Sequence, residues 1–182
     1  PSSGDLCIRC HSPGGWMEGR SVDTSGGLIT AKYRESVQCD FCHRLVDPVY
    51  QPGVSPIEDV AVLDELDDVP GSYANGMFVA DPAPIRRGPY ADAQAAHAFL
   101  ESPFHRSSDL CGTCHDVTLA NGFRLEEAFS EFKNSPAAKR GLTCNDCHMG
   151  REPGRALGRS EEHTSELQSL TNRGCRHLRE NG

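Results

Sequence analysis

The pattern Cys-x-x-Cys-His occurs four times in this chain of 182 residues. Two thiols at this spacing are ambiguous by themselves, because they also serve zinc sites, iron–sulfur clusters and thiol redox centres. Here a histidine directly follows every pair, and only one of the nine cysteines, Cys175, lies outside the pattern. The group that these four motifs bind therefore constrains the fold more than any other feature of the sequence. We number them one to four: Cys7–His11, Cys39–His43, Cys111–His115 and Cys144–His148.

Each residue of the pattern has a task in the covalent attachment of a c-type haem. The two thiols can add to the two vinyl groups on one edge of a porphyrin, and the histidine then lies under the ring as the proximal ligand of iron. Two four-thiolate zinc or iron–sulfur sites are the alternative, but they leave the four histidines without a role. The sequence therefore predicts four haem c groups, attached through Cys7, Cys10, Cys39, Cys42, Cys111, Cys114, Cys144 and Cys147, with His11, His43, His115 and His148 binding iron.

The composition offers little for a core made of side chains alone. Only 37% of the residues are hydrophobic and 7% aromatic, with 18 glycines and 12 prolines, and such a domain would be marginally stable. Four haems, one for about every 45 residues, would supply large apolar bodies around which short helices and loops can pack. We therefore expect the haems to form the core and the haem-free chain to be largely unfolded.

The motifs also predict a compartment. Haem attachment of this type takes place outside the bacterial cytoplasmic membrane, so we expect a periplasmic or otherwise extracytoplasmic protein. The chain shows no signal peptide and no apolar run long enough to span a membrane, and it starts with Pro1 instead of Met, as a mature form or a fragment would. Its formal net charge of -8, made more negative by haem propionates, argues against nucleic acid as a partner.

Two histidines outside the motifs are candidates for distal iron ligands. His97 lies in the alanine-rich stretch from Tyr90 to Glu101, which we predict to be a short helix that ends at Ser102-Pro103. His105 follows this break, so the two imidazoles should serve different irons, and His105 could cap the haem of motif three or that of a neighbour. For either residue, a plain surface position is the competing interpretation.

Two of the eight axial positions then lack an obvious histidine. Met17 and Met77 are possible thioether ligands, although ordinary packing explains each of them as well. Otherwise the missing ligands lie beyond this sequence, or one iron is open.

Two further features are expected to pack against haem. Trp16 should lie on a haem edge, with a partly exposed loop position as the alternative. A second helix is predicted at about Leu125 to Lys133, where Leu125, Ala128, Phe129 and Phe132 recur at helical spacing.

Charged residues mark the segment 51–90, which is rich in proline, glycine and acids and contains neither histidine nor cysteine. Arg86 and Arg87 are candidate partners for haem propionates, since a guanidinium can bind a carboxylate with two hydrogen bonds; surface arginines are the alternative. An acidic run could dock a basic redox partner or form a solvated loop face. It consists of Glu58, Asp59, Asp64, Glu65, Asp67 and Asp68.

The spacing of the motifs predicts a tetrahaem domain over residues 1–158. It would contain two dihaem units, about 1–50 and 91–158, joined by segment 51–90. Residues 159–169 read Arg-Ser-Glu-Glu-His-Thr-Ser-Glu-Leu-Gln-Ser, which looks like the translation of a sequencing-library adapter. We expect the native sequence to end near Gly158 and the tail 159–182 to be non-native and disordered, so that His163, His177 and Cys175 are poor ligands; otherwise both histidines become candidate distal ligands.

The motifs and their surroundings resemble bacterial multihaem cytochromes c. The stretches Leu6 to Trp16, Gln38 to Arg44, Ser102 to Asp116 and Cys144 to Met149 are most similar to the tetrahaem electron carrier of ammonia oxidisers and its relatives. The wider group includes hydroxylamine oxidoreductase, pentahaem nitrite reductase and octahaem tetrathionate reductase. The resemblance implies a mainly α fold with extensive loops and little or no β-sheet, organised around four haems, mostly with two histidines on each iron.

Three functions are compatible with such a chain, because the motifs specify the cofactor better than the reaction. The favoured one is electron transfer between periplasmic redox partner proteins through a chain of haems, without substrate chemistry. The second is a haem enzyme, or a fragment of one, whose open iron acts on a small nitrogen or sulfur compound, with Arg106, Asp109 and Asp116 as unselected candidates for acid–base work. The third is a redox sensor or a module of a larger multihaem protein.

Overall fold

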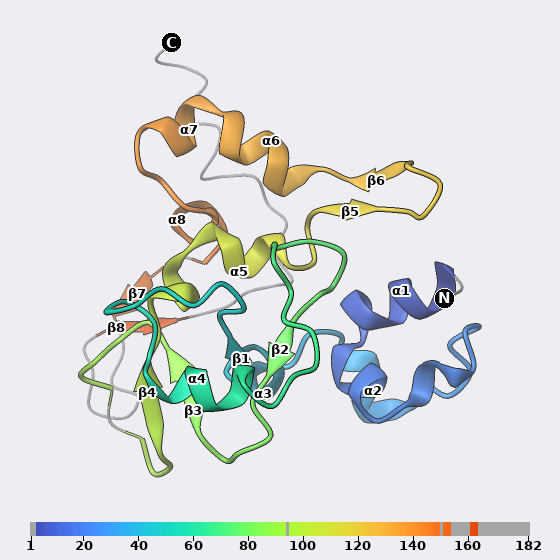
Figure 1. Cartoon of the computed structure of the whole chain (residues 1–182), viewed down its shortest axis with the longest axis horizontal. Helices are drawn as coiled ribbons and strands as arrows, with labels where there is room; N and C mark the ends of the chain where they lie inside the picture. Colours follow the sequence, from blue (N-terminus) through green and yellow to red (C-terminus); the bar gives the residue numbers. More distant parts are fainter. Residues whose placement is uncertain (1–2, 94, 150, 154–160, 164–182) are drawn as a thin grey trace.

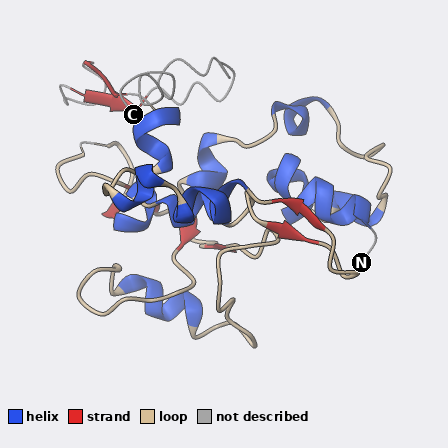
Figure 2. Ribbon diagram, turned by 90° about the horizontal axis from the view of Figure 1, so that it is seen from above, coloured by secondary structure: helices blue, strands red, loops and turns tan. Residues whose placement is uncertain are grey.

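The computed structural model describes residues 3–93, 95–149, 151–153 and 161–163. Short helices and pairs of short strands are joined by long loops (Figure 1, Figure 2). The α-helices are α1 (Ser3–His11), α2 (Pro13–Met17), α3 (Cys39–Cys42), α4 (Glu58–Leu63), α5 (Ser108–Gly112), α6 (Ala128–Asn134), α7 (Pro136–Lys139) and α8 (Cys144–His148). The 3-10 helices are η1 (Arg20–Val22), η2 (Ala31–Glu35) and η3 (Pro103–Arg106).

The strands form two-stranded sheets, each too small to build a layer of the fold. Three of the pairings are antiparallel: β1 (Leu45–Val46) with β2 (Val79–Ala80), β5 (Val117–Thr118) with β6 (Arg124–Glu126), and β7 (Arg151–Pro153) with β8 (Glu161–His163). The pairing of β3 (Arg86–Gly88) with β4 (Phe99–Glu101) is parallel.

Two small clusters of apolar side chains form the core of the described chain. The first contains Phe41, Leu45 and Phe104, with Tyr73 and Phe78 packed against it. The second contains Val46, Leu63 and Val79. The strands β1 and β2 supply residues to both clusters, so this hairpin-like pair joins the region after motif two to α4.

The predicted helix over residues 90–101 is wrong. The chain turns after Pro89, His97 lies in a bend, and Phe99–Glu101 forms β4. Its backbone pairs with β3 in the register Arg87 to Leu100. Helix propensity is a weak preference that long-range pairing overrides, and an alanine-rich sequence does not reveal a strand partner that lies before it in the chain.

The helix predicted at about Leu125 to Lys133 is confirmed, but it begins three residues later. It is α6, Ala128–Asn134, and it buries Phe129. Leu125 instead belongs to β6 and is 54% exposed. The apolar spacing of residues 128–132 is thus a helical signal, whereas Leu125 fits that spacing by coincidence.

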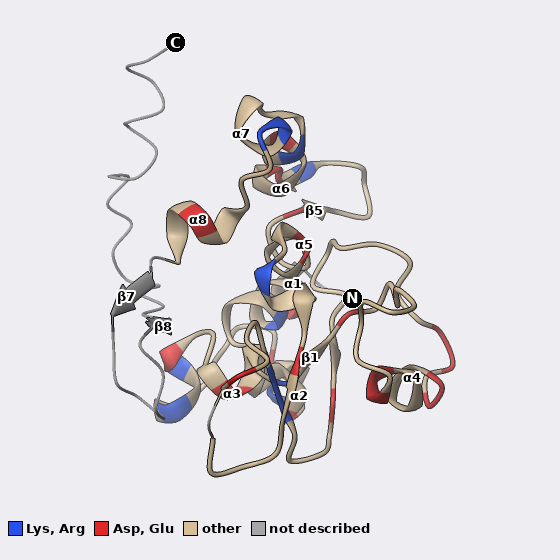
Figure 3. Ribbon diagram, turned by 90° about the vertical axis from the view of Figure 1, so that its left-hand side faces the viewer, with Lys and Arg blue, Asp and Glu red and all other residues tan. Residues whose placement is uncertain are grey.

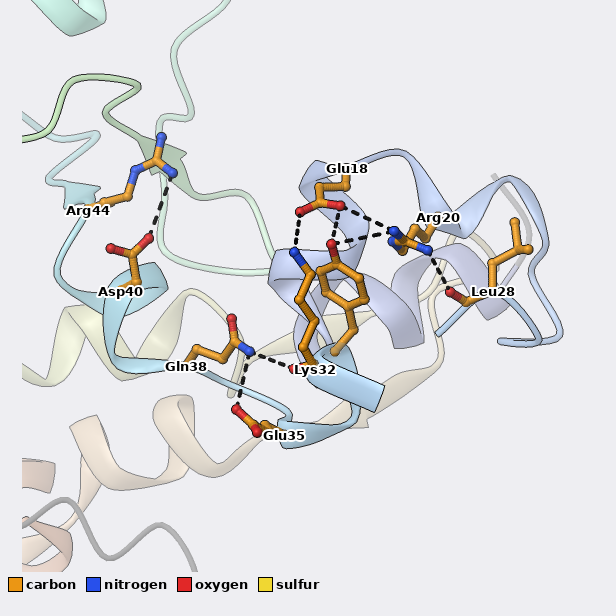
Figure 4. Close-up of polar contacts among 9 residues, drawn as sticks. Glu18, Arg20, Leu28, Lys32, Glu35, Gln38, Asp40 and Arg44 are labelled. Carbon is orange, nitrogen blue, oxygen red and sulfur yellow. Dashed lines mark hydrogen bonds and ion pairs between the residues drawn. The ribbon is translucent and has the colours of Figure 1, made fainter. Parts of the chain in front are cut away.

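The connection between motifs one and two is held together by Glu18. Its carboxylate accepts a hydrogen bond from the Tyr33 hydroxyl and lies 3.4 Å from both Arg20 Nη2 and Lys32 Nζ (Figure 4). The amide of Gln38 then donates to the Lys32 carbonyl oxygen over 2.6 Å. Since Gln38 directly precedes α3, these contacts fix where motif two begins.

Most of the acidic run lies on the surface around α4, and one member does not. Figure 3 marks acidic residues in red on the ribbon of this helix, and Glu58, Asp64 and Glu65 are exposed. Asp59 is 0% exposed, because it faces inward to a buried arginine described below. In the part of the chain that the structure describes, no helix is long and apolar enough to cross a membrane.

Candidate haem-attachment sites

Each motif lies on or beside a turn of helix, which puts its two thiols on the same side. Motif one ends α1, motif two forms α3, motif three begins on α5, and motif four forms α8. Side chains three positions apart on a helix are neighbours, as two adjacent vinyl groups of a porphyrin require. The start of α8 is fixed by Thr143, whose backbone N–H donates to Asp146 Oδ2 over 2.7 Å in a capping box.

The thiols of different motifs also lie against one another. Cys10 of motif one is hydrogen-bonded to Cys114 of motif three, and Cys111 of motif three to Cys144 of motif four. In Figure 1, α5 lies between α1 and α8. Motif three is therefore in contact with motifs one and four. The Cys10–Cys114 contact crosses the boundary between the two predicted dihaem units, whereas Cys111 and Cys144 belong to the same unit.

These contacts divide the thiols by acidity. The hydrogen bond from Cys111 lowers the pKa of Cys144 to about 6. Burial of Cys144 acts in the opposite direction, but its effect is smaller. The same bond and burial raise the pKa of the Cys111 thiol. The Cys10–Cys114 bond likewise lowers the pKa of Cys10 and raises that of Cys114. Burial raises the pKa of Cys42 to about 11, so its thiol is the protonated, unreactive form at neutral pH.

A loop from segment 51–90 closes over motifs one and three. The backbone N–H of Asn75 donates to the Asp116 carbonyl oxygen over 2.8 Å, and that of Gly76 donates to the Thr113 carbonyl oxygen over 2.6 Å. Gly76 has a φ of 63°, and a Cβ there would lie 3.1 Å from Cys10 Sγ. The left-handed backbone and this close approach together require glycine.

His43 is the candidate proximal ligand with the best-defined environment. Its Nδ1 lies 2.6 Å from the Arg87 carbonyl oxygen. A carbonyl can only accept a hydrogen bond, so Nδ1 carries the proton and Nε2 is left with its lone pair. That tautomer is the one in which an imidazole binds iron through Nε2. The other three proximal candidates, His11, His115 and His148, are exposed.

The side chain of His105 lies against motif two. It is 5% exposed, and its Nε2 donates to the Cys42 carbonyl oxygen over 2.9 Å. Its ring is nearly parallel to that of His43, with an interplanar angle of 12° and 6.0 Å between the ring centroids. The structure thus brings this candidate distal ligand to the proximal candidate of a neighbouring motif. Iron binding through Nε2 would require His105 to release Cys42.

The remaining ligand candidates are more exposed. His97 is exposed, and its Nδ1 donates to the carbonyl oxygen of its own neighbour Ala98 over 3.0 Å. Met77 is 43% exposed and its sulfur lies 3.8 Å from Arg9 Nη1; Met17 is 39% exposed. His163 and His177 lie where no side chain is described, and the predicted disorder of the tail falls largely outside the described residues.

Trp16 packs on protein groups. Its ring meets Phe78 edge to face at a centroid distance of 5.4 Å, and the Arg9 guanidinium lies 4.9 Å from its centroid. Its Nε1–H donates to Asp5 Oδ1 over 3.1 Å. A haem edge at Trp16 stays a prediction.

The two predicted propionate partners occupy different environments. Arg86 Nη2 lies 2.5 Å from Asp40 Oδ1 at the surface. Arg87 is 0% exposed and lies between the carboxylates of Asp59 and Asp81. Neither acid was predicted to be the partner of Arg87. Asp59 stands in the acidic first turn of α4, directly before its apolar residues, and this position does not reveal which cation it binds.

The residues fit a covalently bound haem at motif two, since the thiols share one helical turn and His43 is held in the iron-binding tautomer. Among the described residues, no three side chains of the types His, Cys, Asp or Glu converge as a ready-made metal site; the thiols meet in pairs. No family model matches the chain, and neither curated proteins nor solved structures include a match.

Proposed function

We propose that this chain is a multihaem c-type cytochrome that carries electrons between periplasmic redox partner proteins. The observation that supports it is the contact of thiols between motifs. Haems attached at motifs one and three would have the sulfur atoms of Cys10 and Cys114 close together, and haems at motifs three and four those of Cys111 and Cys144. Cofactors anchored so closely suit electron transfer from one to the next.

The residues of the chain have simple tasks in this proposal. The haems supply one-electron chemistry when bound. The cysteines hold each porphyrin edge, and the helical turns set their spacing. His43 is kept with its proton on Nδ1 by the Arg87 carbonyl. The exposed acids around α4 offer a docking surface for a basic partner, which would speed association at low ionic strength.

The test of the proposal begins with cofactor load. Protein produced with c-type maturation should carry four haems by mass spectrometry, and acid–acetone should not extract them. Replacing both cysteines of one motif with serine should remove one haem from the mass. Zinc in place of haem, or fewer than four adducts, would contradict the proposal.

The second part of the test separates a carrier from an enzyme. The electron paramagnetic resonance spectrum of the oxidised protein counts low-spin and high-spin irons. A carrier should show rapid electron exchange with small redox proteins and no turnover of nitrite, hydroxylamine or tetrathionate. A high-spin iron together with turnover of one of these compounds would establish the enzyme instead.

A further inference from the structure

We propose that Arg87, held by Asp59 and Asp81, is the positioning residue of His43, and that it keeps the reduction potential of the haem at motif two low. This inference rests on the proposed function. It also gives segment 51–90, which lacks cysteine and histidine, a role other than connecting two dihaem units.

Arg87 contacts His43 through both of its own backbone polar groups. The Arg87 carbonyl oxygen accepts the hydrogen bond from His43 Nδ1 over 2.6 Å, and the Arg87 N–H donates to the His43 carbonyl oxygen over 2.7 Å. The imidazole is therefore fixed relative to its own backbone by a single residue. If the Arg87 backbone moves, its carbonyl oxygen moves with it, and the hydrogen bond to His43 Nδ1 changes.

The Arg87 side chain anchors that backbone. Nε and Nη2 both lie 2.8 Å from Asp59 Oδ1, and Nη1 lies 2.8 Å from Asp81 Oδ2. The exposed fractions of the three side chains are 0% for Arg87, 0% for Asp59 and 5% for Asp81. Asp59 belongs to α4 and Asp81 follows β2, so three separate parts of the chain meet at one guanidinium.

Asp81 is itself tied to the residue that follows His43. Its backbone N–H donates to the Arg44 carbonyl oxygen over 2.9 Å, and Arg44 Nε donates to the Asp81 carbonyl oxygen over 2.7 Å. The end of motif two is thus fastened twice, through His43 to Arg87 and through Arg44 to Asp81. The ion pair between Arg87 and Asp81 closes this loop of contacts.

Stability alone gives a weak reason for this arrangement. A buried ion pair often stabilises a fold no better than apolar residues of the same volume, and fixing one geometry is a better-attested use. Here the ion pairs fix the position of the Arg87 carbonyl oxygen, which accepts the hydrogen bond from His43 Nδ1. A hydrogen bond from Nδ1 to a carbonyl makes the imidazole a stronger donor to the metal, which favours ferric iron and lowers the potential.

Two substitutions of Arg87 separate positioning from charge. Arg87→Lys keeps the positive charge but loses the planar fork; positioning predicts a raised potential for one haem, whereas a charge effect predicts no change. Arg87→Met removes the charge as well; positioning still predicts a raised potential, whereas loss of a nearby cation alone predicts a lowered one. The four potentials are resolved by redox titration followed by nuclear magnetic resonance.

The second readout is the exchange of the His43 Nδ1 proton with solvent. It should be protected in the unmodified holoprotein and exchange about tenfold faster in Arg87→Lys, because the acceptor is released. Asp59→Asn keeps the arginine and the side-chain shape, and should accelerate exchange as well. Arg140→Lys is the matched control: Arg140 is exposed at the end of α7, and its substitution should alter neither readout.

The outcomes distinguish the inference from the proposed function. A holoprotein without haem at motif two contradicts the proposed function. Four haems with unchanged potentials and exchange in Arg87→Lys contradict only the positioning role. If the Arg87 variants do not fold, Asp59→Asn and the protection measured in the unmodified protein decide the question, and an unprotected Nδ1 proton overturns the inference.

Discussion

At the scale of single residues, His105 combines burial with a position beside His43, the candidate proximal ligand of another motif. If it caps the iron at motif two, His105→Ala replaces an imidazole by water or by nothing, and that iron becomes high-spin with an altered potential. The other three irons should keep their spectra. Paramagnetic resonance counts the change, and carbon monoxide binding should appear with it.

The competing role of His105 is structural. The substitution then costs about 2 kcal/mol of unfolding free energy, because a buried ring and its bond to Cys42 are lost, while the low-spin count stays the same. An unchanged count would remove His105 from the ligand set. His97→Ala tests the second histidine separately, and its exposed position predicts little effect on stability.

Asp5 is a second residue whose contacts lead to a measurable effect. The Ser21 hydroxyl donates to its Oδ1 over 2.6 Å, and with contacts from Arg9 and Trp16 this holds the pKa of Asp5 below its usual range. A depressed pKa means that Asp5 stabilises the fold at neutral pH and loses this effect as the pH falls below about 4.

We therefore expect Asp5→Asn to lower the free energy of unfolding by about 1 kcal/mol at pH 7. The difference from the unmodified protein should shrink as the pH falls toward 3, because the carboxyl group then becomes protonated in the unfolded state while the native contacts still favour its ionised form. Denaturant titrations at both pH values measure it. Asp68→Asn, at an exposed position, is the control; a difference that grew on acidification would contradict the assignment.

At the scale of elements, α5 and α6 pack through the glycine of motif three. A Cβ at Gly112 would lie 2.7 Å from Phe129 ring carbons, closer than real contacts allow. Gly112→Ala should therefore push α6 away and cost about 1–3 kcal/mol of stability, as thermal unfolding would show. Gly71→Ala is the control, since a Cβ there meets nothing within 4 Å; equal costs for both would exclude a packing effect.

The sequence revealed local elements better than distant pairings. The motif residues follow from spacing alone, and α6 follows from Phe129 and Phe132 at helical intervals. The parallel β3–β4 pair was missed because three-residue strands carry almost no periodic signal. The Asp59–Arg87 contact and the approach of His105 to His43 join residues far apart in the chain, and neither residue type nor spacing encodes such partners. The bound haems themselves remain a prediction.

At the scale of the whole molecule, the chain has little core of its own. In the described part of the chain, the two apolar clusters are built on three buried residues each, and α-helices of four to nine residues are not stable alone. The haem-free chain, with all eight motif cysteines replaced by serine, should therefore lack a cooperative thermal transition and near-ultraviolet circular dichroism. The four-haem protein is the comparison. Cooperative unfolding of the haem-free chain would show that the side chains suffice.

The contacts of Cys10 with Cys114 and of Cys111 with Cys144 also bear on how such a chain is made. In an oxidising compartment, two free thiols in contact are substrates for disulfide formation, and a thiol with a pKa near 6, as at Cys144, reacts readily. Cys10 emerges during synthesis more than about a hundred residues before its partner, whereas Cys111 and Cys144 emerge close together. Where haem is scarce, these thiols stay free in a chain that lacks a fixed fold. A Cys111–Cys144 crosslink, which closes the shorter loop, should then trap more molecules than a Cys10–Cys114 crosslink.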